Sequence, residues 1–464
     1  MDFSFWDERR LVLFSRSLTL ALLGAALALI LGLLAAYFLW NRKRPVWFSA
    51  VLILALPLSP MMYVYSLEYI YGLFNLKTAP QLSIIISYSL QLLPLNALAI
   101  YNGFLSVSST EIDAARVLRS DYACLFQVII RRNLPLMLIL VLFSTVMNLL
   151  DYSIPALFGV SVYSLDIFAV FSATGDVLRV ALQSLPVFIL SLSTFIVLLI
   201  LLRSVWSVNP QGNTGRCFGQ SKNIALTISE AFGCIVCLLP LLAVLSALAP
   251  LLINSQVFLT AVSTSLGDLS YSLRISALAA IFGTALAVGF RAFGGALLPF
   301  ALLFAAMPPA LVGILLLYTL SSFRVLDSIM PVIALILRFF PFAAVLLYMA
   351  KRLENKDENR AALLFARTKT VWLFRYKLPV MLPSLLISAT IIFVLSLGEI
   401  GATLLVIPPG SNTLTIKLYN YMHYGSGASV SGLASLLGVT VALITAAAWG
   451  LWRYLKRSQR EIYD

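Results

Sequence analysis

Long apolar runs separated by short polar stretches extend over the whole chain. Eleven of these runs approach the roughly 20 residues that a helix needs to cross a bilayer core. Their apolar positions are continuous rather than alternating, which favours membrane helices over β-barrel strands. The expected spans are 11–40, 46–67, 80–101, 134–149, 184–202, 224–253, 269–290, 296–320, 329–350, 378–397 and 431–454. The pattern therefore predicts an all-α, polytopic integral membrane protein.

Two polar interruptions, at 108–133 and 351–377, differ from the other loops. They contain the sequences EIDAARVLRSDYACLFQVIIRRNLP and ENRAALLFARTKTVWLFRYKLP. In each, an Ala-Ala pair precedes an apolar-aromatic stripe at helical spacing, then a basic cluster, then Leu-Pro at the start of a new apolar run. One such loop alone would fit a helix lying on the inner leaflet. Two at matching places favour docking of a partner protein.

The two halves of the chain repeat one another. Pro60 matches Pro309, Tyr101 matches Tyr348 and Asp151 matches Glu399, at offsets close to 250 residues. The polar, glycine-containing stretch 206–223 is the expected linker between a first half of about five spans (1–205) and a second half of about six (224–464). Both halves have the same orientation, and a parallel repeat of this kind usually places a pathway between its halves.

The positive charge follows the membrane topology. The chain is 61% hydrophobic and only 11% charged, with a formal net charge of +13. If 41–45, 102–133, 203–223, Arg291, 351–377 and 453–464 are all cytoplasmic, 23 of the 32 Lys and Arg residues lie on that side. This is the positive-inside bias. It places the N-terminus outside, and it explains the charge without nucleic acid.

Few polar residues within the spans are candidates for chemistry. Asp151 and Glu399 lie near the outer ends of equivalent spans, and Arg338 lies just before Pro341. We consider these three residues as pathway or gate residues, and as the alternative we consider carboxylates that cap broken helices. The sequence contains one histidine and no G-x-x-x-x-G-K-[ST] loop. We therefore expect no metal, no cofactor and no enzymatic activity in this chain.

The two loops resemble the segments by which permeases of type I ABC importers contact their ATPase subunits. The segment SLGEIGATLLVIPPGSNTLTIKLYNYM (396–422) is similar to the corresponding part of fused permeases of the iron(III) and thiamine type. Asp113 and Arg360 stand where the family usually has Glu, and Arg119 and Ala366 stand where it usually has Gly. The resemblance implies that the ATPase contacts are made by Asp113, Ala114, Ala115, Arg116, Leu118, Arg119, Ala361, Ala362, Phe365, Ala366 and Arg367.

The resemblance implies a transmembrane subunit of an importer in the bacterial inner membrane, with both halves in one chain. Two copies of an ABC ATPase subunit would bind at the cytoplasmic face, and a solute-binding protein would deliver iron(III), thiamine or another small solute outside. The alternatives are a secondary transporter driven by an ion gradient, which would have carboxylates deep in its helices, and a membrane-embedded lipid transferase, which would need an Asp-rich or His/Asp motif. The sequence favours the importer subunit.

Overall fold

The computed structural model describes residues 7–41, 46–118, 120–205, 224–293, 297–320, 322–323, 326–425 and 427–463. In these ranges the regular secondary structure is entirely helical. Nine of the described helices are long and apolar enough to cross a membrane, and two bent helix pairs raise the number to 11 if each pair is one span. The predicted all-α, multi-pass membrane fold is confirmed. The expected linker, 206–223, and Arg119 lie outside the described residues.

Two of the expected spans, 46–67 and 296–320, are not continuous helices. The first is a pair of helices bent by 105°, and the second is a pair bent by 98°. The second helix of each pair begins at a proline, Pro60 and Pro309. A proline has no N–H to donate and forces the preceding residue out of the helical region, as the extended backbone of Ser59 illustrates. The apolar content continues across the break, so hydrophobicity alone predicted an unbroken span.

The chain forms two compact units, of which unit 1 comprises residues 1–262 and 418–438. Its helices are α1 (Glu8–Asn41), α2 (Val46–Ala55), α3 (Pro60–Phe74), α4 (Pro80–Leu105), α5 (Ser109–Leu118), α6 (Asp121–Cys124), the π-helix η1 (Leu125–Ile130), α7 (Arg131–Leu150), α8 (Ser153–Leu157), α9 (Tyr163–Thr174), α10 (Val177–Val205) and α11 (Ile224–Ile253). The first turns of α12 (Ser255–Ala292) and parts of α20 (Leu414–Tyr424) and α21 (Gly427–Tyr463) complete it. Unit 1 therefore contains residues from both halves of the repeat.

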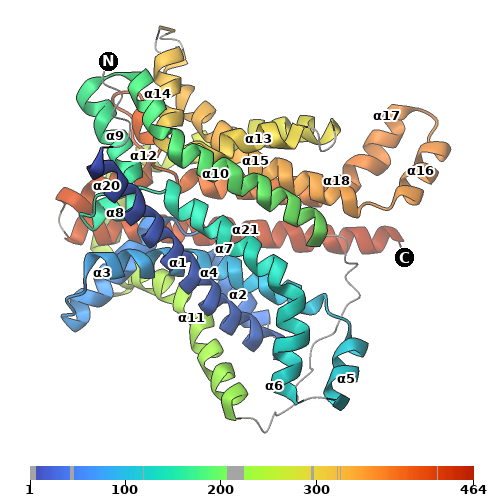
Figure 1. The fold of residues 1–464 in the computed structure, drawn as a ribbon. Helices are drawn as coiled ribbons and strands as arrows, with labels where there is room; N and C mark the ends of the chain where they lie inside the picture. Colours follow the sequence, from blue (N-terminus) through green and yellow to red (C-terminus); the bar gives the residue numbers. More distant parts are fainter. Residues whose placement is uncertain are drawn as a thin grey trace. The chain divides into compact units, whose positions relative to one another are not determined.

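Helix α1 is the centre of unit 1, where it packs along α4, α7 and α11 (Figure 1). Small residues allow this close approach. A Cβ atom on Gly24 would lie 2.8 Å from Tyr88 Cβ on α4, and one on Gly233 of α11 would lie 2.4 Å from the Leu34 carbonyl oxygen on α1. Helices in lipid gain stability from such close packing, because lipid supplies no hydrophobic force between them.

Unit 2 comprises residues 263–417 and 439–464. It contains most of α12 (Ser255–Ala292), then α13 (Leu298–Ala306), α14 (Pro309–Leu320), α15 (Met330–Leu353), α16 (Lys356–Phe365), α17 (Lys369–Trp372), the π-helix η4 (Leu373–Lys377), α18 (Leu378–Leu397) and α19 (Thr403–Val406), with the start of α20 (Leu414–Tyr424) and the end of α21 (Gly427–Tyr463). Within this unit α15 packs against α13 and α18, and α14 packs against α19.

The order of elements repeats once along the chain. A long leading helix, a bent pair, another long helix, a loop of short helices and a π-helix, a long helix, two short helices and a final long helix occur from α1 to α10 and again from α12 to α21. Helix α11 has no counterpart before α1 among the described residues. The repeated order of elements agrees with an internal repeat, and the same orientation of both halves in the membrane stays a prediction.

Candidate functional site

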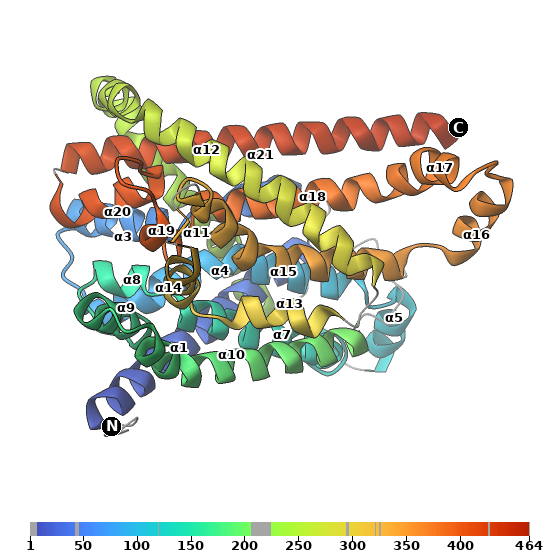
Figure 2. The same cartoon turned by 90° about the horizontal axis from the view of Figure 1, so that it is seen from above.

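The two amphipathic loops have the same local architecture. In the first, a ten-residue helix (α5) is followed by a short break, the four-residue α6, the six-residue π-helix η1 and the 20-residue α7. In the second, the corresponding elements are α16, α17, η4 and α18, with lengths of 10, 4, 5 and 20 residues. Figure 2 shows α16 and α17 lying beyond the ends of α15 and α18. π-Helical turns are rare and occur frequently at functional sites.

Helix caps at equivalent positions explain why each loop folds in this way. The Ser108 hydroxyl accepts a hydrogen bond from Glu111 N at 3.3 Å, and its counterpart Asn355 accepts from Asp357 N at 3.0 Å. The second short helix of each loop is capped in the same manner by Ser120 and by Thr368. Such side chains satisfy backbone N–H groups that a helix leaves without partners at its start. Both breaks are thus encoded locally.

Each loop exposes an apolar side chain at the same position of the repeat. Val117 on α5 is 85% exposed, and Leu364, which lies 247 residues later on α16, is 84% exposed. The second loop adds Leu363 and Phe365, and Phe365 is 90% exposed. An apolar surface of this kind beyond the end of a membrane helix is suited to contact with another protein.

The first loop is attached to unit 1 through an apolar core. Ile112 on α5 is fully buried in a cluster that includes Trp40, Phe104, Cys124 and Ile129, and Ala115 packs against this cluster. An ion pair between Glu111 and Arg132 joins the start of α5 to the start of α7. Helix α5 is therefore fixed to the spans on either side of it.

The second loop is attached through charged groups instead. At its base in unit 2, Glu354 forms ion pairs with Arg291 at the end of α12 and with Lys377 Nζ at 2.6 Å. Lys351 Nζ also donates to the Arg291 carbonyl oxygen at 3.2 Å. Burial acts to raise the pKa of Glu354, but hydrogen bonds from Lys377 and Arg291, together with their charges, outweigh it and lower the pKa. A single carboxylate thus joins the ends of α12, α15 and α18 that adjoin the second loop.

The two candidate carboxylates of the spans cap the short helices that follow them. Asp151 Oδ2 accepts from Ile154 N at 3.2 Å, at the start of α8. Glu399 accepts from Ala402 N at 2.7 Å and from Thr403 N at 3.0 Å, at the start of α19. Arg338 Nε lies 3.6 Å from Glu399 Oε1, so the structure brings these two candidates together. This is the capping geometry considered from the sequence, and a pathway role for the three residues stays a prediction.

The predicted ATPase contacts fall into groups of different exposure. Asp113, Ala114, Ala361 and Arg367 are exposed, whereas Ala115, Ala362 and Ala366 are partly buried. Arg116 donates from Nε to Asp121 Oδ1 at 3.2 Å, which ties α5 to α6. Leu118 ends α5, and nothing is described of its side chain; Arg119 lies outside the described residues.

Two features of the site are not among the predicted contacts. The exposed apolar residues Val117, Leu363 and Leu364 are the first, and the 247-residue offset that aligns Val117 with Leu364 is the signal that points to them. The Arg291–Glu354–Lys377 cluster is the second, and because its members are 63 and 23 residues apart no local pattern links them.

Comparison with known proteins agrees with this geometry. Residues 277–461 match the family described as "Binding-protein-dependent transport system inner membrane component", a stretch that begins within α12 and contains the whole second loop. Two relatives, the molybdenum transport system permease proteins ModB of Mycobacterium bovis and Mycobacterium tuberculosis, are each 31% identical over 169 residues. The alignments cover 33% of this chain and 63% of each relative, so the chain spans less than two thirds of their length. The family match assigns the fold of type I ABC importer permeases to residues 277–461.

Proposed function

We propose that this chain is the transmembrane permease subunit of an ATP-driven importer and contains both halves of the translocation pathway. The observation that carries the proposal is the pair of equivalent loops, each capped in the same way and each exposing an apolar residue, Val117 and Leu364, at the same repeat position. The family match over residues 277–461 supports it, since it includes the second loop.

The partners proposed are two copies of an ABC ATPase subunit, one at each loop, and an extracytoplasmic solute-binding protein. Two similar loops fit two copies of one subunit better than two unrelated proteins. The second loop segment, 351–377, contains eight Lys and Arg residues. We expect the groove that receives it to be apolar with an acidic rim, because complementary charge speeds association and fixes its register. ATP hydrolysis belongs to the partner, and this chain is not itself an enzyme.

The contacts that attach each loop to its neighbouring helices determine how a displacement of the loop is transmitted to the membrane spans. Closure of the ATPase subunits on ATP would displace α5 and α16. Displacement of α16 would reach α12, α15 and α18 through Glu354, which binds Arg291 and Lys377. In the first half, the apolar cluster around Ile112 would transmit the movement of α5 by direct packing. Transport by alternating access needs elements of this kind that move as rigid bodies between two packed arrangements.

The experiment that tests the proposal is co-purification of the chain with its ATPase subunit from nanodiscs. We expect Val117→Glu and Leu364→Glu together to abolish association, since each places a charge on an exposed apolar contact. The partly buried Ala115 is unsuitable, because a charge there would disturb the cluster against which it packs. Leu76→Glu, at an exposed residue between α3 and α4, is the matched control.

Loss of the ATPase from the folded double variant, with retention in the control, supports the proposal. If the intact chain associates with no ATPase and instead transports solute in response to an ion gradient, the secondary transporter is correct. If the loops bind anionic vesicles and no protein, they are interfacial helices.

The solute proposed is small and polar. The sequence resemblance suggests iron(III) or thiamine, whereas the relatives' name refers to molybdenum transport. Uptake assays with these three solutes in proteoliposomes containing the complete complex would distinguish them.

A further inference from the structure

A pocket of about 550 Å³ lies in unit 1, away from both loops. It is lined by residues of α3, of the junction between α11 and α12, and of the end of α20 and the start of α21. Its polar lining includes Tyr65, Glu68, Tyr69, Asn254, Tyr421 and Ser431. The volume lies within the range typical of sites for small organic ligands, about 300–1,000 Å³.

Two groups in this pocket have no hydrogen-bond or ion-pair partner within the described part of the chain. Tyr65 is only 6% exposed, and its hydroxyl makes no hydrogen bond within the described part of the chain. Glu68 is exposed at the pocket and has no ion pair or hydrogen bond among the described residues. A buried hydroxyl without a partner is uncommon in folded proteins. Both groups are therefore available to a ligand.

The aromatic rings and the carboxylate define the chemistry of that ligand. The rings of Tyr65 and Tyr69 lie with centroids 6.1 Å apart, and Tyr421 contributes a third ring to the lining. Among the described lining residues none is a Lys or Arg. Rings attract a cation through their electron-rich faces, and a carboxylate pairs with it directly. A negatively charged oxyanion would be repelled by Glu68, the charged residue of this lining.

The position of the pocket relates it to transport. It lies where α3 of the first half meets α11, α20 and α21 of the second half, all within unit 1. The pocket is lined by α3, which precedes the start of α4, and the other end of α4 leads to α5 and the first loop. If the loop is cytoplasmic, the pocket is on the outer side.

We propose that this pocket binds an organic ammonium group, with Glu68 pairing with the charge and with Tyr65, Tyr69 and Tyr421 surrounding it. The group belongs either to a small solute entering the pathway or to an amine-bearing lipid headgroup. The role as an entry site rests on the proposed import function, whereas the binding itself requires no ATPase.

The test is calorimetric titration of the full chain in phosphatidylglycerol nanodiscs. The probes are choline, its uncharged isostere 3,3-dimethylbutan-1-ol, and molybdate. We expect saturable binding of choline only. Glu68→Gln should weaken binding roughly tenfold to a hundredfold, the effect of losing a charge-assisted contact, whereas Glu68→Asp should retain part of the affinity. Glu8→Gln, at a carboxylate that does not line the pocket, is the matched control.

Equal binding of choline and its isostere, unchanged affinity in a folded Glu68→Gln variant, or preferential binding of molybdate would overturn the proposal. Repeating the titration in discs containing phosphatidylethanolamine identifies the source of the ammonium. Competition by this lipid assigns the site to a headgroup, and unchanged choline binding assigns it to a free solute. Failure of ATPase co-purification would leave the titration result intact, so the two proposals fail separately.

Discussion

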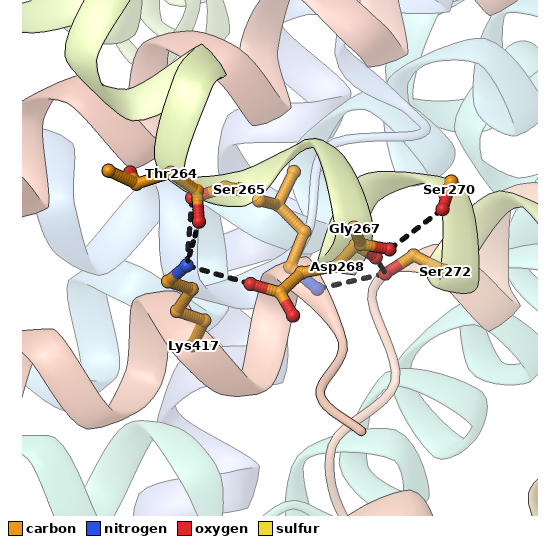
Figure 3. Close-up of polar contacts among 8 residues, drawn as sticks. Thr264, Ser265, Gly267, Asp268, Ser270, Ser272 and Lys417 are labelled. Carbon is orange, nitrogen blue, oxygen red and sulfur yellow. Dashed lines mark hydrogen bonds and ion pairs between the residues drawn. The ribbon is translucent and has the colours of Figure 1, made fainter. Parts of the chain in front are cut away.

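Lys417 Nζ lies 2.7 Å from Asp268 Oδ2, and this ion pair joins α20 to α12 in unit 2 (Figure 3). The ammonium also donates to the Thr264 carbonyl oxygen and to Ser265 Oγ, each at 2.9 Å. One helical turn away, Leu414 N donates to Ser272 Oγ at 2.8 Å. The start of α20 is therefore held to α12 by both a backbone contact and a charge pair.

The first half contains a related arrangement in which the short helix contributes the acid and the long helix contributes the base. Tyr163 N donates to Ser17 Oγ at 2.7 Å, and Asp166 on α9 lies 3.6 Å from Arg9 Nη2 on α1. Asp166 and Lys417 occupy equivalent positions of the repeat, 251 residues apart. At the 255-residue offset that aligns Ser17 with Ser272, Asp268 aligns with Leu13, and Arg9 lies one helical turn before it.

Reversal of one charge tests this contact. Lys417→Glu places a carboxylate beside Asp268 and removes three donors, so we expect it to lower the free energy of unfolding by about 1–3 kcal/mol. The double variant Lys417→Glu with Asp268→Lys should recover much of the loss. The apparent melting temperatures of the single and the double variant in detergent measure the loss and its recovery. A single variant as stable as the parent chain would contradict the role of the pair.

Acidification should weaken the base of the second loop. The pKa of Glu354 is lowered in the folded chain from its ordinary value of 4.5. The stabilisation it contributes is thus fully present above pH 4.5 and is lost as pH falls through the lowered folded pKa. We expect the difference in melting temperature between the parent chain and Glu354→Gln to shrink as pH falls below 4.5. A difference that stays constant between pH 7 and pH 3 would exclude this explanation.

Replacement of the two helix-capping carboxylates by amides should have unequal effects. Asp151 accepts hydrogen bonds through both oxygens, from Ser153 at Oδ1 and from Ile154 N at Oδ2, and an amide keeps only one acceptor, so Asp151→Asn should cost about 1 kcal/mol. Glu399→Gln keeps the side-chain length but removes the charge facing Arg338, so we expect a loss of about 1–3 kcal/mol. Thermal melting measures both variants. A change in uptake rate by Asp151→Asn without a change in melting temperature would indicate a pathway role for this residue.

Two glycines provide a matched test of helix packing. A Cβ on Gly233 would lie 2.4 Å from the Leu34 carbonyl oxygen, a backbone atom that cannot move aside easily, whereas nothing lies within 4 Å of a Cβ on Gly289. We expect Gly233→Ala to lower the melting temperature markedly. Gly289→Ala should be neutral or stabilise its helix by about 0.5–1 kcal/mol. Equal effects of the two substitutions would contradict the close approach of α11 to α1.

The helical membrane fold, the repeat and the place of the two loops could be predicted from the order of residues. These properties depend on the length of apolar runs and on equal spacing of similar segments, both of which can be read along the chain. The helix caps Ser108 and Asn355 can also be predicted from the sequence, because each contacts a backbone N–H only two or three residues away.

Which loop residues are exposed, and which charged side chains form ion pairs, depends on the folded arrangement of the helices. Ile112 and Leu364 are both apolar residues of a loop helix, yet one is buried in a core built from distant helices and the other faces outward. Glu354 meets Arg291 across 63 residues of sequence, and the pocket combines Tyr65, Asn254 and Tyr421. Burial and ion pairing depend on partners that the chain brings together only when it folds, so no local pattern contains them.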